Sequence, residues 1–61
     1  MSALGARATF RTRTDDRVEA LCTEERNAMP IFDVEIVRDG EVIEYLPHVY
    51  GHSGLMALAE R

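Results

Sequence analysis

The sequence has few of the residues that staple a small protein together. It holds one cysteine, Cys22, in 61 residues, so no disulfide can form within the chain. One Cys and two His are too few for a closed structural zinc site of the usual kind. No apolar run approaches the roughly 20 residues that span a bilayer, and residues 1–10 lack the apolar core of a signal peptide. We therefore expect a cytoplasmic protein with a reduced thiol and no membrane association.

The chain also lacks Trp and Lys, and all seven of its basic residues are Arg. Hydrophobic residues make up 46% and charged residues 30%, which is typical of a folded domain rather than a disordered tail. A chain of this length forms one domain, residues 1–61, with a small core, and we expect residues 1–6 to be a flexible arm. Unstapled domains of this size commonly oligomerise or dock on a larger partner.

The net charge of −4 is unevenly distributed. Residues 1–14 carry three Arg and no acid, whereas residues 15–61 carry four Arg against eleven acids, a charge of −7. An acidic body of this kind repels nucleic acid unless the basic arm alone makes the contact.

The first half of the chain predicts a strand followed by a helix. Residues 8–14, ATFRTRT, alternate and favour β-structure. Thr14 then precedes two acids, which suits a helix N-cap, and residues 15–28 place Val18, Leu21, Cys22 and Ala28 near one stripe. Pro30 ends this predicted short helix.

The stretch FDVEIVRDGEVIEY predicts a β-hairpin. Asp39-Gly40 between two alternating runs is a strong signal for a two-residue type I′ turn, which needs positive φ at both positions. In that register Arg38 faces Glu41 and pairs with it, and Val37 faces Val42. The remaining pairs are Ile36 with Ile43, Glu35 with Glu44 and Val34 with Tyr45. One face then holds five apolar or aromatic residues that we expect to build the core: Phe32, Val34, Ile36, Ile43 and Tyr45.

The end of the chain predicts a second short helix. Residues 47–52 are expected to form a loop or irregular edge after Pro47, and Ser53 can cap a helix over residues 54–61 with Leu55, Leu58 and Ala59 turned inward. The predicted fold is α+β, in β-α-β-β-α order, with the hairpin packed by two short helices.

One face of the predicted hairpin is acidic and amphipathic. It holds Asp33, Glu35, Val37, Val42, Glu44 and Leu46. Acids directly opposite each other destabilise a sheet, so something should neutralise them. Either Arg11 and Arg13 of the first strand reach this face, or a basic surface of a partner protein covers it.

The basic start of the chain suggests a different function. A strand RATFRTRT followed by TDDRVEAL resembles the opening of ribbon-helix-helix repressors, in which paired strands of a dimer enter the DNA major groove. This resemblance implies that Thr9, Arg11 and Arg13 read bases. It covers about a quarter of the chain and fails downstream, where Pro30 and a hairpin replace the second helix of that family.

Catalytic and metal-binding patterns are weak. His48 and His52 share a face only in a helix, which Pro47 and Gly51 disfavour, and Cys22 lies on the predicted inner stripe, where a thiol acts as a small hydrophobe. The glycines form no phosphate-binding motif. We expect no metal, no cofactor and no enzymatic activity.

The predicted helix–hairpin–helix core resembles small phage head-completion proteins, and small phage-borne inhibitors of bacterial defence are similarly compact and acidic. The leading hypothesis is therefore an acidic, non-catalytic protein that binds a larger protein as an inhibitor or assembly accessory, with self-association as a further possibility. The alternative is a dimeric DNA-binding regulator.

Overall fold

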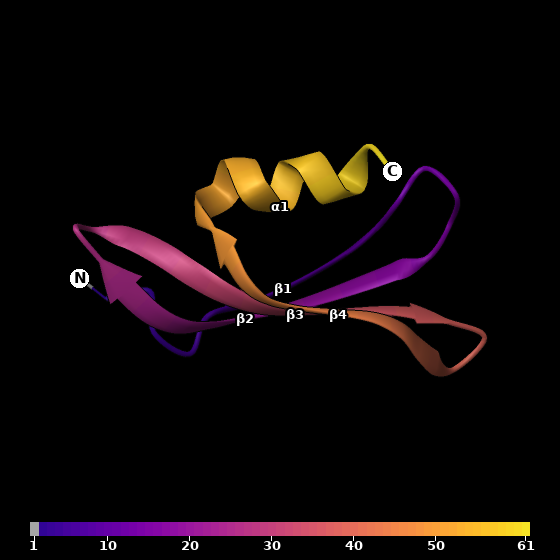
Figure 1. Ribbon diagram of the computed structural model, residues 1–61, viewed down its shortest axis with the longest axis horizontal. Coiled ribbons are helices and arrows are strands. Elements are labelled where there is room, and N and C mark those ends of the chain that lie inside the picture. The colour runs from indigo at the N-terminus through magenta and orange to yellow at the C-terminus, as the bar shows by residue number, and fades with distance from the viewer. Residues whose placement is uncertain (1) are drawn as a thin grey trace.

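The chain forms one antiparallel sheet with a helix on one side. The computed structural model describes residues 2–61 (Figure 1). The elements are β1 (Arg7–Arg11), β2 (Arg17–Arg26), β3 (Met29–Arg38), β4 (Glu41–Tyr50) and α1 (Gly51–Ala59). The strands lie in the order β1-β2-β3-β4, and each pairs with the next. We call the side of the sheet under α1 the covered face and the opposite side the open face.

The predicted helix over residues 15–28 is wrong, and with it the β-α-β-β-α order. This segment is mainly β2, so four strands precede a single helix. Val18, Ala20 and Cys22 are buried at a spacing of two residues, whereas Leu21 projects between them to the open face. The apolar residues of this segment fit the periodicity of a helix and also that of a strand. The segment forms a strand because it pairs with β1 on one side and β3 on the other.

Two tight turns connect the three long strands. Asp39 and Gly40 have φ values of 52° and 80°, which confirms the predicted turn with positive φ at both positions. Asn27 and Ala28, assigned to the end of the predicted helix, have φ values of 52° and 63° and join β2 to β3 in the same way. Alanine rarely adopts this conformation, which is why the second hairpin is hidden in the sequence.

The pairing of β3 with β4 follows the prediction only next to the turn. Arg38 faces Glu41 and Val37 faces Val42, as predicted. The register then shifts, and Ile36 faces Glu44 instead of Ile43. Ile43 is the extra residue of a β-bulge, so Glu44, Tyr45 and Leu46 change face relative to the prediction.

The last part of β4 was predicted to be a loop and is a strand. β4 continues through Pro47 to Tyr50, with a second register shift opposite Asp33. β4 is an edge strand, where a residue without a backbone N–H is tolerated.

The core lies between the covered face and α1. The helix begins three residues earlier than predicted, and the predicted burial of Leu55 and Leu58 is confirmed. These two side chains pack on one cluster of buried residues: Val18, Ala20, Cys22, Phe32, Val34 and Ile36. Only one face of the sheet is therefore protected by a second layer.

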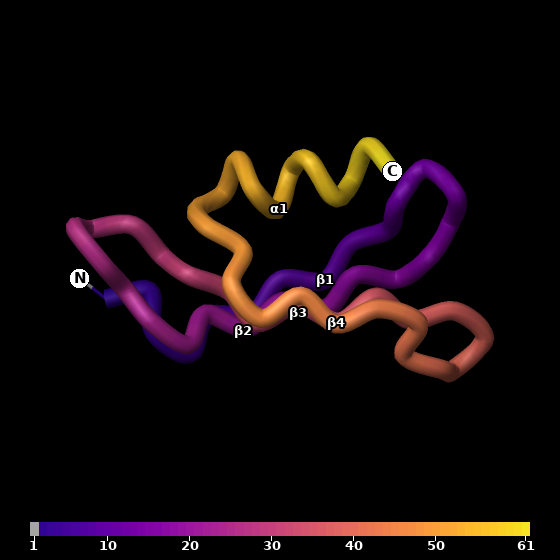
Figure 2. Tube along the Cα trace, in the orientation of Figure 1, coloured from indigo at the N-terminus to yellow at the C-terminus, as the bar shows by residue number. Residues whose placement is uncertain are grey.

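The C-terminus closes one end of the molecule. It lies beside the loop between β1 and β2 (Figure 2), where the Thr14 N–H donates to the Arg61 carbonyl oxygen at 3.3 Å. At the other end the Gly5 N–H donates to the Cys22 carbonyl oxygen at 2.9 Å. Met1, part of the predicted arm, lies outside the described residues. Within residues 2–61 no helix combines the length and the apolar character needed to cross a membrane.

Candidate interaction surface

The open face is built by residues that alternate with the core along each strand. In one row across the sheet Glu19 lies between Thr9 and Glu35, and Glu35 faces Tyr45 on β4. The neighbouring rows place Leu21 beside Asp33 and Arg17 beside Val37. From β1 to β4 the face carries Arg7, Thr9, Arg11, Arg17, Glu19, Leu21, Asp33, Glu35, Val37, Val42 and Tyr45.

These residues divide the face into three zones. Arginines lie along β1 and at the start of β2, acids lie in the middle on β2 and β3, and apolar or aromatic side chains lie toward β4. A shallow hollow of about 260 Å³ lies over the middle zone. Its lining includes three acids, Glu19, Asp33 and Glu35, but only one arginine, Arg7.

The acids of the middle zone differ in how they are neutralised. The Glu19 carboxylate pairs with Arg17 at 2.7 Å. The Tyr45 hydroxyl donates to Asp33 at 3.0 Å, and this hydrogen bond to a carboxylate raises the pKa of Tyr45. Among residues 2–61, Asp33 and Glu35 form no ion pair.

The predicted acidic face is therefore found only in part. Asp33, Glu35, Val37 and Val42 lie together on the open face, as predicted. Glu44 and Leu46 lie on the covered face, and placing them on the acidic face was wrong. The bulge at Ile43 moves both, and the register analysis could not detect it because alternation alone does not mark an extra residue. The bulge brings Tyr45, which was assigned to the core, to the open face instead.

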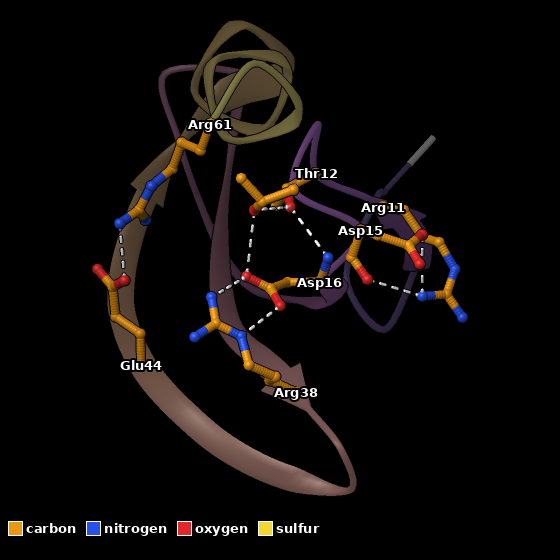
Figure 3. A network of polar contacts seen from close by, with 8 residues as sticks. Arg11, Thr12, Asp15, Asp16, Arg38, Glu44 and Arg61 are labelled. Atoms are coloured by element: carbon orange, nitrogen blue, oxygen red, sulfur yellow. Dashed lines mark hydrogen bonds and ion pairs between the residues drawn. The ribbon is translucent and has the colours of Figure 1, made fainter.

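The structure decides which arginine neutralises Glu44. The Arg61 Nη2 donates to Glu44 Oε1 at 2.8 Å, so the end of the chain pairs with this acid (Figure 3). Within residues 2–61 neither Arg11 nor Arg13 pairs with Glu35 or Glu44. Arg11 instead donates to the carbonyl oxygen of Asp15 at 2.9 Å.

A second polar cluster lies at the end of the sheet and serves the fold. The Asp16 carboxylate accepts two hydrogen bonds from Arg38, from Nε and Nη2, both at 2.8 Å (Figure 3). The predicted pair between Arg38 and Glu41 is thus replaced. The Thr12 hydroxyl accepts the Asp16 N–H at 3.1 Å, and Thr14 donates to the same carboxylate at 3.3 Å.

This cluster leaves Asp16 fully paired. Its side chain is 9% exposed, and the hydrogen bonds from Arg38 lower its pKa below the ordinary value despite burial. The contacts join the loop after β1 to the end of β3. Because the Asp16 carboxylate and the hydroxyls of Thr12 and Thr14 have partners within the chain, we assign this cluster to stability.

The remaining candidate residues do not come together. Cys22 is buried as a free thiol and donates to the Glu24 carbonyl oxygen at 3.4 Å. The His52 ring contacts the edge of Phe32, with centroids 5.9 Å apart. In the described part of the chain, no group of three or more His, Cys, Asp or Glu is arranged to hold a metal ion.

The exposed large hydrophobic side chains are concentrated on β4. In the described range 2–61, seven such residues are exposed, and four of them belong to this strand: Val42, Ile43, Tyr45 and Tyr50. Val42 and Tyr45 lie on the open face, where Tyr45 faces Glu35 and its hydroxyl donates to Asp33. Sequence reasoning missed this concentration because it placed Ile43 and Tyr45 in the core.

Comparisons with known proteins identify no family for this chain. The chain matches no protein-family model, and no curated protein or solved structure shows significant similarity to it.

Proposed function

We propose that this protein is a non-catalytic binding protein that docks on a larger protein partner through one part of its open face. This part, which we call the β3–β4 patch, consists of Asp33, Glu35, Val37, Val42 and Tyr45. The observation that carries the proposal is that two acids, which form no ion pair within residues 2–61, lie beside exposed apolar and aromatic side chains.

The composition of the patch suits a protein interface. Aromatic residues dominate the binding energy of many interfaces, and Tyr45 is 56% exposed on the β4 side of this patch. Val37 and Val42 supply apolar area beside it. Asp33 and Glu35 favour a basic partner surface, because opposite charges steer association and exclude wrong partners.

The size and charge of the chain agree with a role as inhibitor or assembly accessory, such as a phage or another mobile element would carry. We place this role in the cytoplasm, since Cys22 is a free thiol and the described fold uses no disulfide. Partner binding rather than catalysis fits a face whose hollow is shallow and open.

DNA binding through β1 is the second candidate. One observation favours it, because Arg7, Thr9 and Arg11 are exposed and project from the same side of an edge strand. The ribbon-helix-helix arrangement itself is not present, since β1 is followed by a strand. This candidate requires duplex binding at low salt that Arg11→Ala and Arg13→Ala each weaken.

The decisive experiment compares charge reversals inside and outside the patch. Tagged wild-type protein, Glu35→Lys and Glu60→Lys are used to capture proteins from a lysate of the expressing cells, and the captured proteins are quantified by mass spectrometry. Glu60 is exposed beyond the end of α1, so its replacement changes the net charge equally at a distant site.

We expect one captured protein to be lost with Glu35→Lys and kept with Glu60→Lys. Equal capture by all three forms contradicts the proposal. Binding to duplex DNA that is insensitive to Glu35→Lys but lost with Arg11→Ala selects the second candidate instead.

A further inference from the structure

The two edges of the sheet are built differently. β1 has five residues, and charged Arg7 and Arg11 stand at its ends, which is a common protection against unwanted strand pairing. β4 has ten residues and carries four of the seven large hydrophobic side chains that are exposed in the described part of the chain. Both strands have one neighbour in the sheet, so each leaves one row of backbone groups unpaired. The apolar side chains make β4 the edge that is suited to a contact.

Only part of β4 can accept a further strand. Pro47 has no backbone N–H to donate, and the register shifts again next to it. The usable edge is Glu41–Leu46. Within it Val42 lies on the open face and the bulge at Ile43 brings Tyr45 to the same face, so the two form a short row beside any strand that pairs with this edge.

The charges near this edge specify the incoming side chains. Glu35 faces Tyr45 from β3, and Asp33 accepts the Tyr45 hydroxyl. A cation placed beside Tyr45 gains contact with the exposed ring and with these two acids together. A side chain placed beside Val42 meets an apolar row that continues to Val37.

We propose that the β4 edge at Glu41–Leu46 pairs with an extended segment of the partner, which sets an Arg or Lys beside Tyr45 and an apolar residue beside Val42. Binding by strand addition gives affinity through main-chain hydrogen bonds and specificity through alternate side chains. This inference rests on the proposed function and adds the mode of binding and the chemistry of the bound segment.

A second copy of the chain is a less suitable occupant. Two β4 strands side by side would bring the acids of both β3–β4 patches toward one interface. The β1 strand of another copy has the required basic residues, but a β1-to-β4 contact is head-to-tail, so it repeats from copy to copy and builds a ring or an open chain of molecules. A basic segment of a different protein satisfies the charge and gives a finite complex.

The test uses peptides selected on the intact protein. A library of random peptides is displayed and selected on immobilised full-length chain, and the consensus peptide is synthesised. Two further versions carry backbone N-methyl groups, one on the even and one on the odd positions. Because alternate N–H groups of a strand point in opposite directions, only one set can donate to β4.

We expect the selected peptides to share a basic and an apolar residue at positions that face the same side of an extended strand, because the places beside Tyr45 and Val42 both lie on the open face. One N-methylated version should bind at least about tenfold more weakly than the parent, because several main-chain hydrogen bonds are lost together. The other version should bind within about twofold of the parent, since its methyl groups face away from β4.

Substitutions in the protein test the same contact from the side of β4. Val42→Lys and Tyr45→Ala should weaken binding of the parent peptide. Met56→Lys adds a charge at an exposed hydrophobic residue of α1 and should leave this binding unchanged. Circular dichroism melting of each variant establishes that it is folded. If Val42→Lys is unfolded, the effect of Tyr45→Ala on peptide binding decides this part of the test.

Three results overturn the inference. Equal affinity of both N-methylated peptides, with sensitivity to Glu35→Lys retained, means that the patch binds side chains without strand addition, so the proposed function survives alone. Peptides that lack basic residues and ignore Glu35→Lys contradict both proposals. Growth of the protein alone into large assemblies that Val42→Lys abolishes assigns the edge to a second copy.

Discussion

Replacing Leu55 by alanine tests how α1 is held on the sheet. Leu55 and Leu58 are the two large side chains that the helix buries, and Leu55 is 6% exposed. Truncating a buried leucine to alanine costs about 2–5 kcal/mol, depending on how far the site collapses. A domain of 61 residues has a total stability of about 3–9 kcal/mol, so this one change removes a large fraction of it.

The assay is urea unfolding followed by circular dichroism and tyrosine fluorescence. With a slope of about 1 kcal/mol/M, the expected loss lowers the midpoint by about 2–5 M, or leaves the variant unfolded in water. Met56→Ala is the matched control, because the neighbouring Met56 is 70% exposed and should change stability by less than about 0.5 kcal/mol. A Leu55→Ala loss no larger than that of the control would refute the packing of α1 on the covered face.

Three further predictions concern single contacts. Gly54→Ala should lower the thermal midpoint despite the better helix propensity of alanine, because a Cβ there would lie 2.8 Å from a β4 side chain; a raised midpoint would contradict this close approach. Arg38 lowers the pKa of Asp16 in the folded state, so this stability is present above the unfolded pKa of about 3.9 and is lost as pH falls through the lower folded value. Acid should therefore destabilise the wild type more steeply than Asp16→Asn in pH-dependent urea unfolding, and parallel curves would contradict this. Absorbance titration should show the pKa of Tyr45 above the ordinary tyrosine value in the wild type and lowered in Asp33→Asn; no change between the two would rule out their hydrogen bond.

The sequence predicts those parts of the fold that depend on neighbouring residues. The turn at Asp39-Gly40, the first pairs beyond it and the burial of Leu55 and Leu58 are confirmed, because local backbone preference and local alternation determine them. Burial of Val18 and Cys22 is also confirmed, although their element was assigned wrongly.

The wrong assignments have a tertiary origin. Residues 15–28 contain good helix formers, and the strand wins because β2 pairs on both sides and buries Val18, Ala20 and Cys22 at alternate positions. The acidic face was half predicted, since the bulge at Ile43 depends on how β4 bends over the core and reverses the side on which Glu44 lies. A bulge leaves no mark in an alternating sequence.

The most direct measurement of the central claim is amide hydrogen exchange with and without the bound partner or selected peptide. The account predicts that amides of Glu41–Leu46 on β4 gain protection, together with those of β3 around Glu35, while amides of β1 and α1 change little. Protection confined to β1 or α1, with β4 unchanged, would contradict docking at the β3–β4 patch.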